Sequence, residues 1–264
     1  MTIDIYLPLQ AWDTQFHEGS PKIQPMDLLG KAIMDYYREK DPVQLSSHSS
    51  LGTTEEVPVP YFFRDFEQMP PLEQKALGYC SGKVLDIGCG VGSHSLYLQH
   101  KGAEVVGLDQ SSLALEVAAS RGLDKTVCSD IMDFKVGKFD TLLLLMNGVG
   151  LAGSLKGLQR LLEHLAGLLN PGGQILMDSS DLIYMFESDE DGGVWAPGEV
   201  AYYGEVTYHW EYDNLQGGTF PWLFVDYQTL ESVSGPLGYR TELLELGSHF
   251  DYLARLTREG IREF

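Results

Sequence analysis

The chain has 264 residues, 44% of them hydrophobic and 21% charged, which suits one elaborated globular domain or two small ones. Eighteen Lys and Arg against 38 Asp and Glu give a net charge of −20, which opposes binding to nucleic acid or to anionic membranes. Cysteines without paired spacing (Cys80, Cys89 and Cys128), no signal-peptide pattern after Met1 and no membrane-length apolar run predict a cytoplasmic protein.

The first 80 residues form a mixed section, which we expect to be an N-terminal extension or cap on a core over residues 81–264. Apolar side chains recur at helical spacing between Asp27 and Arg38 and predict a helix there. The polar stretch Ser46–Glu56 is interpreted as a loop, and the aromatic segment Tyr61–Phe66 follows it.

Between residues 82 and 181 the pattern alternates regularly between strand and helix. Helices are expected after Gly92, over Ser112–Ser120 and over Ser154–Leu169. This alternation predicts an α/β fold, a doubly wound Rossmann-like sheet that is mostly parallel with an antiparallel last strand. Such sheets bind ligands at the carboxyl ends of their strands. The expected strands are Val84–Ile87, Glu104–Leu108, Lys125–Ser129, Phe139–Met146 and Gln174–Asp178.

After residue 181 the character of the chain changes. Aromatic or aliphatic residues at even spacing from Tyr202 to Tyr212 predict a strand with one aromatic face. A turn at Gly217-Gly218 leads into Phe220–Val225, so we expect an inserted antiparallel β unit at about 182–222. A helix over Asp226–Val233 and strands over Tyr239–Leu246 and Phe250–Leu256 are expected to complete the sheet. The aromatic face is either core, which we favour, or a lid that stacks on a substrate.

The segment Asp86-Ile87-Gly88-Cys89-Gly90-Val91-Gly92 carries the strongest functional signal. An apolar strand runs through a glycine turn into a helix, which exposes backbone and a helix N-terminus to a ligand. In a dinucleotide-binding turn this surface meets a pyrophosphate, which a carboxylate would repel. Asp86 therefore favours a ligand that presents a cation, such as the ammonium group of an amino acid.

Two further acids follow Asp86 at regular intervals. Asp109 lies one strand–helix–strand step after it, and Asp130 lies one step after Asp109. Each step returns the chain to the same sheet edge, so the three carboxylates are expected to line one crevice.

These residues resemble class I S-adenosylmethionine-dependent methyltransferases. The first motif is followed by similar segments in the family's order, and the likeness is close over about residues 80–181. The chain as a whole also resembles an uncharacterised group of small bacterial methyltransferases. The matching segments are Asp86–Gly92, Val105–Ser111, Cys128–Ile131, Phe139–Leu142 and Leu169–Gly173.

The resemblance implies S-adenosylmethionine as cofactor. In the family, residues of the first motif hold the methionine end, the second strand's acid binds ribose, and the third acid accepts from adenine. The implied cofactor-binding residues are Asp86, Ile87, Gly88, Cys89, Gly90, Asp109, Gln110, Asp130, Ile131 and Asn147.

Simpler roles stay open for several of these residues. The glycines can form a tight turn without a ligand, Asp109 can cap the next helix, and Asp130 can be a solvated loop acid. Asn147 is either near the reacting sulfur or a turn-former before Gly148. The family's Asn/Asp-Pro-Pro-aromatic motif is missing at Met146-Asn147-Gly148-Val149, which weighs against nucleobase or glutamine substrates.

On the acceptor side, Tyr61, Arg64 and Tyr184 are the candidate substrate residues. Arg64 can pair with the methionine carboxylate, although we favour a plain packing or surface role for Tyr61 and Arg64. His249 and Asp181 are possible bases, but the sequence assigns no catalytic residue, and we expect no metal site.

The leading interpretation is methyl transfer to a small-molecule acceptor, in an unspecified oligomeric state. One alternative is a nicotinamide-dependent oxidoreductase, although its fingerprint favours glycine where Ser93 stands and an apolar residue where Asp86 stands. Another is an S-adenosylmethionine-binding protein without turnover.

Overall fold

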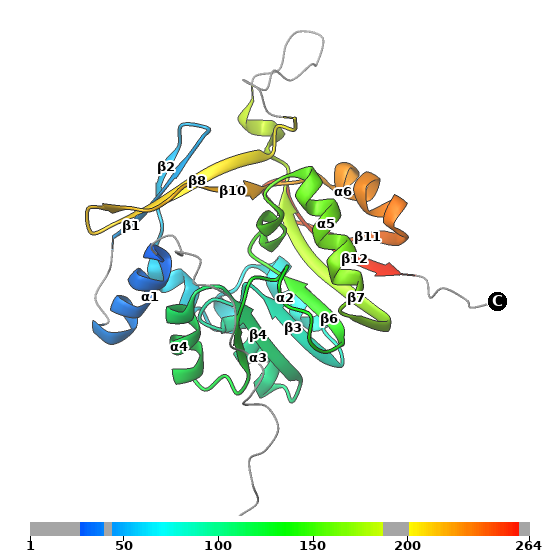
Figure 1. Ribbon diagram of the computed structural model, residues 1–264, viewed down its shortest axis with the longest axis horizontal. Coiled ribbons are helices and arrows are strands. Elements are labelled where there is room, and N and C mark those ends of the chain that lie inside the picture. The colour runs from blue at the N-terminus through cyan, green and yellow to red at the C-terminus, as the bar shows by residue number, and fades with distance from the viewer. Residues whose placement is uncertain (1–26, 40–43, 187–200, 259–264) are drawn as a thin grey trace, which may run out of the picture.

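A computed structural model describes residues 27–39, 44–186 and 201–258 of the chain (Figure 1). Two sheets organise these residues. The larger has seven strands in the order β11-β12-β7-β6-β3-β4-β5, and the smaller has five, ordered β10-β8-β1-β2 with β9 paired to β8.

The large sheet is parallel over five strands, and β12 runs antiparallel to both β7 and β11. The predicted fold class, a mostly parallel doubly wound sheet with an antiparallel last strand, is confirmed. Its strands are β3 (Lys83–Ile87), β4 (Glu104–Asp109), β5 (Thr126–Cys128), β6 (Phe139–Leu144), β7 (Leu169–Ser180), β11 (Tyr239–Leu246) and β12 (Asp251–Arg258).

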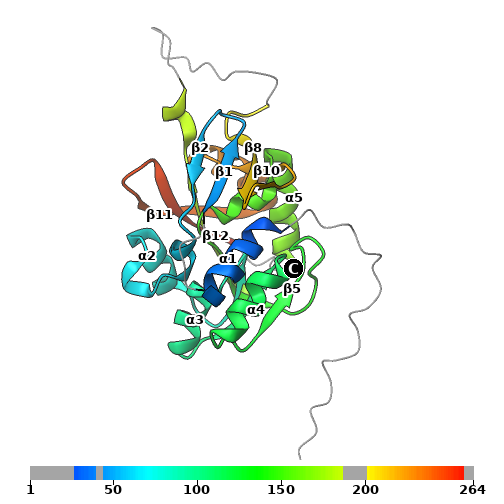
Figure 2. The same cartoon turned by 90° about the vertical axis from the view of Figure 1, so that its left-hand side faces the viewer.

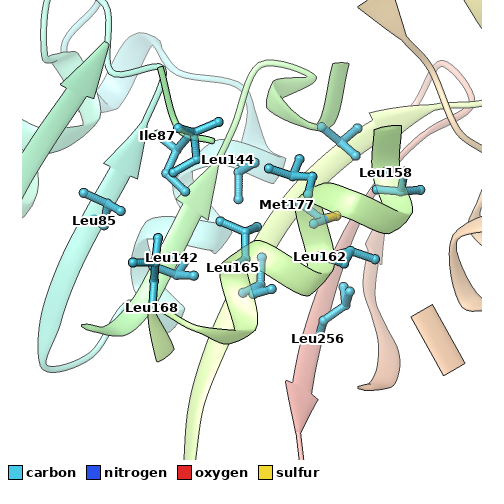
Figure 3. Close-up of a cluster of buried hydrophobic side chains, with 14 of the residues drawn as sticks. Leu85, Ile87, Leu142, Leu144, Leu158, Leu162, Leu165, Leu168, Met177 and Leu256 are labelled. Carbon is cyan, nitrogen blue, oxygen red and sulfur yellow. The ribbon is translucent and has the colours of Figure 1, made fainter. Parts of the chain in front are cut away.

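Helices cover both faces of the large sheet because buried apolar side chains alternate along its strands. Leu142 and Leu144 pack toward α5 and α6, while Leu143 packs toward α2 and α3. Figure 3 shows the first cluster, where leucines of α5 meet the strands. The helices are α2 (Pro71–Tyr79), α3 (Ser93–His100), α4 (Ser112–Ser120), α5 (Leu155–Ala166) and α6 (Tyr227–Ser234).

The small sheet corrects one prediction. Ser46–Glu56 is not a loop but mostly the hairpin of β1 (Leu45–Ser49) and β2 (Thr54–Glu56). The hairpin is polar because β2 is exposed throughout. On its other edge β1 pairs with β8 (Glu205–Tyr212), a strand far away in the sequence. The predicted N-terminal extension and the predicted insertion are thus joined in one sheet.

The insertion contributes the remaining strands of the small sheet, β9 (Leu215–Gln216) and β10 (Phe220–Leu223). Helix α1 (Leu28–Glu39) lies between α4 and this sheet, in contact with both, as Figures 1 and 2 show. Short 3-10 turns complete the description: η1 (Val59–Phe63), η2 (Phe66–Gln68), η3 (Gly148–Ala152), η4 (Leu182–Met185) and η5 (Gly235–Leu237).

Several element ends differ from the expectation, and for two of them the structure shows the reason. Helix α5 stops at Ala166 rather than Leu169, because Leu169 already begins β7 beside β6. Strand β6 ends at Leu144 rather than Met146, because Met146 and Asn147 adopt left-handed φ angles of 59° and 56°. In the described ranges, no helix combines the length and apolarity needed to cross a membrane.

Candidate active site

A cavity of about 600 Å³ lies between the carboxyl ends of β3, β4 and β5 and the small sheet. One side is formed by the glycine loop and the strand ends, and the opposite side by β8 and β10. Many of the residues singled out from the sequence line it: Arg64, Asp86, Ile87, Gly88, Cys89, Gly90, Asp109, Gln110 and Ile131.

The glycine loop presents bare backbone to this cavity. The backbone N–H groups of Gly88 and Cys89 both donate to the carbonyl oxygen of Leu108, which ties the loop to β4. Gly90 has a left-handed φ of 54°, and a Cβ built on it would meet nothing within 4 Å. The loop therefore needs glycine for its backbone conformation and leaves room for a ligand.

Asp86 lies at the end of β3 and is only 2% exposed. One carboxylate oxygen accepts a 2.6 Å hydrogen bond from the Ser95 hydroxyl. Burial raises the pKa of Asp86, against the opposing effects of His94 and Ser95. A desolvated carboxylate at a cavity wall favours a cation as its neighbour, because the cation compensates the lost hydration.

Asp109 connects the glycine loop to the next helix. Its carboxylate oxygens accept hydrogen bonds of 2.8 Å from Gly90 N–H and from Ser111 N–H. Burial raises the pKa of Asp109, and these two bonds act against that rise. The N-cap of α4 is Ser111, whose hydroxyl accepts from Ala114 N–H. Each oxygen of Asp109 keeps a lone pair for a ligand hydroxyl.

Arg64 is part of a buried ionic group that the sequence did not predict. Its Nη2 donates to both carboxylate oxygens of Glu73 at 3.0 Å. His94 Nε2 lies 2.6 Å from Oε2 of the same carboxylate. Nε and Nη1 of Arg64 are buried without a hydrogen-bond partner, and an orphaned buried donor indicates a missing acceptor.

The charges of this group are linked. Burial acts to lower the pKa of His94, but the hydrogen bond to Glu73 and the charges of Asp86 and Glu73 outweigh burial, so the pKa lies above its usual value. Glu73 follows Pro70 and Pro71 in the first turn of α2. No motif marks it, because its role depends on side chains from two other elements.

Two predicted cofactor residues do not line the cavity. Asp130 is exposed, and its carboxylate accepts from Met132 N–H, although its neighbours Ser129 and Ile131 are in the lining. Asn147 lies in the left-handed turn after β6. Its amide donates to the Leu223 carbonyl and accepts from the Ser179 hydroxyl, so its side chain ties β7 to β10. Cofactor contacts by either residue stay predictions.

The other substrate candidates lie outside the lining. Tyr61 is 40% exposed, and its ring lies over the Arg64 guanidinium at 3.5 Å from ring centroid to Cζ. Tyr184 is 55% exposed and stacks on Phe250 at 5.0 Å. Burial raises the pKa of Tyr208 in the lining to about 12, with smaller contributions from Glu55 and Tyr184.

The aromatic face of β8 is not simply core, the interpretation that we favoured. Val206 and Tyr212 are buried at its two ends, but Tyr208 and Trp210 between them line the cavity. Phe220, Trp222 and Phe224 extend this surface. The alternating sequence pattern correctly placed these side chains on one face of β8, but it did not show that this face borders a cavity.

Asp178 is a further residue that the sequence analysis missed. It lies in β7, and one of its carboxylate oxygens accepts from Asn147 N–H at 2.8 Å. Burial raises the pKa of Asp178 to about 7, aided by the charge of Glu73 and opposed by hydrogen bonds from Asn147 and Met146. Asp178 thus holds the backbone turn whose residue Met146 lines the cavity.

Comparison with known proteins gives this geometry a family. Residues 84–173 match the family described as Methyltransferase domain. A solved S-adenosylmethionine-dependent methyltransferase from Bacteroides fragilis, in complex with S-adenosyl-L-homocysteine, is 41% identical. The alignment covers 88% of this chain and 94% of that one, with a TM-score of 0.81.

Curated relatives match over shorter stretches. A ubiquinone biosynthesis O-methyltransferase from Pasteurella multocida is 35% identical over 29% of this chain and 34% of its own length. A cypemycin N-terminal methyltransferase from Streptomyces is 34% identical over 37% of this chain and 42% of its own. The chain thus spans less than half the length of these two relatives.

The likeness to the Bacteroides protein extends over nearly the whole of that protein, well beyond the motif region. The TM-score of 0.81 shows that the two proteins also share their fold. The chain therefore belongs to the class I S-adenosylmethionine-dependent methyltransferases.

Proposed function

We propose that the chain transfers a methyl group from S-adenosylmethionine to a small-molecule acceptor. One observation carries this proposal. The same cavity wall holds the desolvated carboxylate of Asp86 and the Arg64 guanidinium, two of whose nitrogens are buried without an acceptor. An amino acid end, with its ammonium and carboxylate groups, supplies a partner for each.

The remaining wall fits the rest of the cofactor. Asp109, at the end of β4, has free lone pairs suited to ribose hydroxyls. Ile131 is only 4% exposed and offers an apolar surface for a base. When bound, the cofactor supplies an electrophilic methyl group on a sulfonium.

The chain's own residues have mainly to orient the reactants and exclude water. The glycine loop is fixed on one side by its bonds to Leu108 and on the other by Asp109. Arg64 is held by Glu73, so its free edge is presented in one orientation. Groups that are already held in one orientation lose little conformational entropy when a ligand binds.

A small acceptor suits the space and charge of the site. The cavity of about 600 Å³ must hold both cofactor and acceptor, and the net charge of −20 opposes a nucleic acid substrate. The names of the curated relatives point to a small molecule in ubiquinone biosynthesis and to the N-terminus of cypemycin. A reducing, cytoplasmic setting is supported by the free thiols of Cys80, Cys89 and Cys128.

Calorimetric titration with S-adenosylhomocysteine tests the cofactor assignment. We expect saturable binding to the wild type and at least about tenfold weaker binding to Asp86→Asn, because a charge-assisted hydrogen bond is lost. Asp133→Asn is the matched control, since Asp133 is exposed and does not line the cavity. No binding by the wild type at millimolar ligand would defeat the proposal.

The alternatives give different results in the same assay. NADH binding without S-adenosylhomocysteine binding would favour the oxidoreductase. Cofactor binding without formation of S-adenosylhomocysteine from S-adenosylmethionine, across a broad panel of acceptors, would favour a protein without turnover.

A further inference from the structure

The half of the cavity facing the glycine loop is lined by aromatic rings from the small sheet. We call this surface the ring wall. It comprises Tyr208 and Trp210 on β8, Phe220 and Trp222 on β10, and Phe224 just beyond β10. All five are partly exposed although they point into the molecule, which means that they border open space.

The rings of the ring wall form a slab rather than a cage. Phe220 is paired across the strands with Tyr208, their ring centroids are 6.2 Å apart, and their planes differ by 27°. The planes of Trp210 and Phe220 differ by 31° at 6.0 Å. Trp222 stands at 84° to Phe220 and closes one end. Such a surface suits a flat body laid against it.

Trp222 has a fixed position in this wall. A Cβ on Gly150 would overlap its indole, so the ring packs directly on the backbone of η3. The adjacent backbone is anchored as well, because Asn147 donates to the Leu223 carbonyl. The slab is therefore preformed rather than assembled around a ligand.

Other apolar side chains also line the cavity, among them Phe62, Leu145, Met146 and Leu151. We call the half of the cavity lined by the glycine loop, Asp86 and Asp109 the cofactor side. Leu151 adjoins it, since a Cβ on Gly88 would be 3.8 Å from the Leu151 Cδ1. The charged lining residues of the described chain (Arg64, Asp86, His94 and Asp109) belong to the cofactor side. The polar groups that line the cavity near the ring wall are neutral, chiefly the hydroxyls of Ser47 and Tyr208. A nearby carboxylate, Glu55, contributes to the raised pKa of Tyr208, but it is exposed and lies outside the lining.

We propose that the acceptor is an uncharged, flat aromatic molecule with a ring hydroxyl, bound with its ring against the ring wall. This inference rests on the proposed function and adds the substrate class. A charged acceptor would lose its hydration without gaining an ion partner there. A cation held by aromatic rings is best served by rings that surround it, and the slab does not.

The transfer balances as follows. A lone pair of the hydroxyl oxygen forms the new bond to the methyl carbon, the carbon–sulfur bond breaks, and its electrons remain on sulfur as a neutral thioether. The hydroxyl proton passes to water. An aromatic hydroxyl ionises more readily than an aliphatic one (Tyr has a pKa of about 10). When the proton leaves before the new bond forms, apolar walls favour the methyl transfer itself, because the negative oxygen and the positive sulfur then cancel.

The test uses three probes with one ring system: 2-naphthol, which is neutral, 2-naphthoate, an anion, and 2-naphthylmethylammonium, a cation. Calorimetry measures their binding to protein saturated with S-adenosylhomocysteine. We expect 2-naphthol to bind at least tenfold more tightly than either ion. Trp222→Ala should weaken naphthol binding at least tenfold, Trp222→Phe much less, and Tyr79→Leu, at a surface outside this cavity, not at all.

Each outcome decides the inference. Three results would overturn the substrate class while leaving methyl transfer in place. They are binding of either ion as tight as or tighter than that of naphthol, naphthol binding that is unchanged in Trp222→Ala, and no naphthol binding to the protein saturated with S-adenosylhomocysteine. Failure of the wild type to bind S-adenosylhomocysteine at all would instead defeat the proposed function. Turnover of 2-naphthol that rises with pH would support the hydroxyl, and turnover that falls as pH rises would contradict it.

Discussion

The two sides of the cavity are built by opposite strategies. The cofactor side comes from consecutive strands and loops, and most of its binding capacity lies in charges and exposed backbone within residues 84–131. The ring wall, on the other side of the cavity, is apolar and belongs to the small sheet. In that sheet β1 pairs with β8, from which it is separated by more than half of the sequence. Local motifs thus fix the cofactor side, whereas the ring wall depends on long-range pairing and can change without disturbing that motif.

The largest expected effect concerns the buried ionic group on the cofactor side. Glu73→Ala leaves the Arg64 guanidinium buried without its anion, which should lower the free energy of unfolding by about 3–5 kcal/mol. Urea denaturation of the protein without ligand measures it. Glu67→Ala on the neighbouring turn is the control, because Glu67 is exposed and should change stability by less than about 0.5 kcal/mol.

A destabilisation as small as that of the control would mean that Glu73 is not needed to hold Arg64. The cofactor gives a second measurement. Its carboxylate should partly replace Glu73, so S-adenosylhomocysteine should raise the melting temperature of Glu73→Ala at least as much as that of the wild type.

Asp109→Ala is expected to have the next largest effect. It removes an acceptor for ligand hydroxyls and the two bonds that fix the glycine loop. A hydrogen bond to a charged group contributes about 1.5–3 kcal/mol, so affinity for S-adenosylhomocysteine should fall about 10- to 100-fold. Asp130→Ala is the comparison in the same titration. An equal loss there would restore Asp130 to the cofactor site.

The cofactor side was largely predictable from the sequence because its information is local. The helix expected over Ser112–Ser120 coincides with α4, and β3 differs from the expected strand by one residue. Apolar periodicity and glycine position encode such elements within a few residues. The same local reasoning placed Asp86 and Asp109 at strand ends, where the structure has them.

The rest depended on partners distant in the sequence. Strand β1 contains Ser46, Ser47 and His48, whose polarity favours a loop until β8 pairs with them. Glu73 has no role apart from Arg64 and His94, which come from other elements. Period two placed Tyr208 and Trp210 on one face, but a core and a cavity both favour aromatic rings there.

The ring wall offers a separate test of the comparison. In Gly150→Ala the new Cβ overlaps the Trp222 indole, which must move toward the cavity. Overpacking typically costs about 1–3 kcal/mol, and we expect roughly tenfold weaker binding of 2-naphthol with unchanged affinity for S-adenosylhomocysteine. Gly78→Ala is the control, because a Cβ there meets nothing within 4 Å. Parallel loss of both ligands would show that the two sides are coupled.

The smallest expected effect joins the two sides through Asp178, which holds the Asn147 turn between them. Since burial raises the pKa of Asp178 to about 7, its protonated form stabilises the fold at low pH. This stabilisation is lost as pH rises from the unfolded-state value near 4 through about 7. One pKa unit is worth about 1.4 kcal/mol, but the residue as a whole is not fully buried, so we expect a loss of about 1–2 kcal/mol. Asp178→Asn mimics the protonated form and should gain stability over the wild type between pH 5.5 and 8, as measured by urea denaturation. A constant difference over that range would show that Asp178 ionises normally, and that the turn does not depend on its proton.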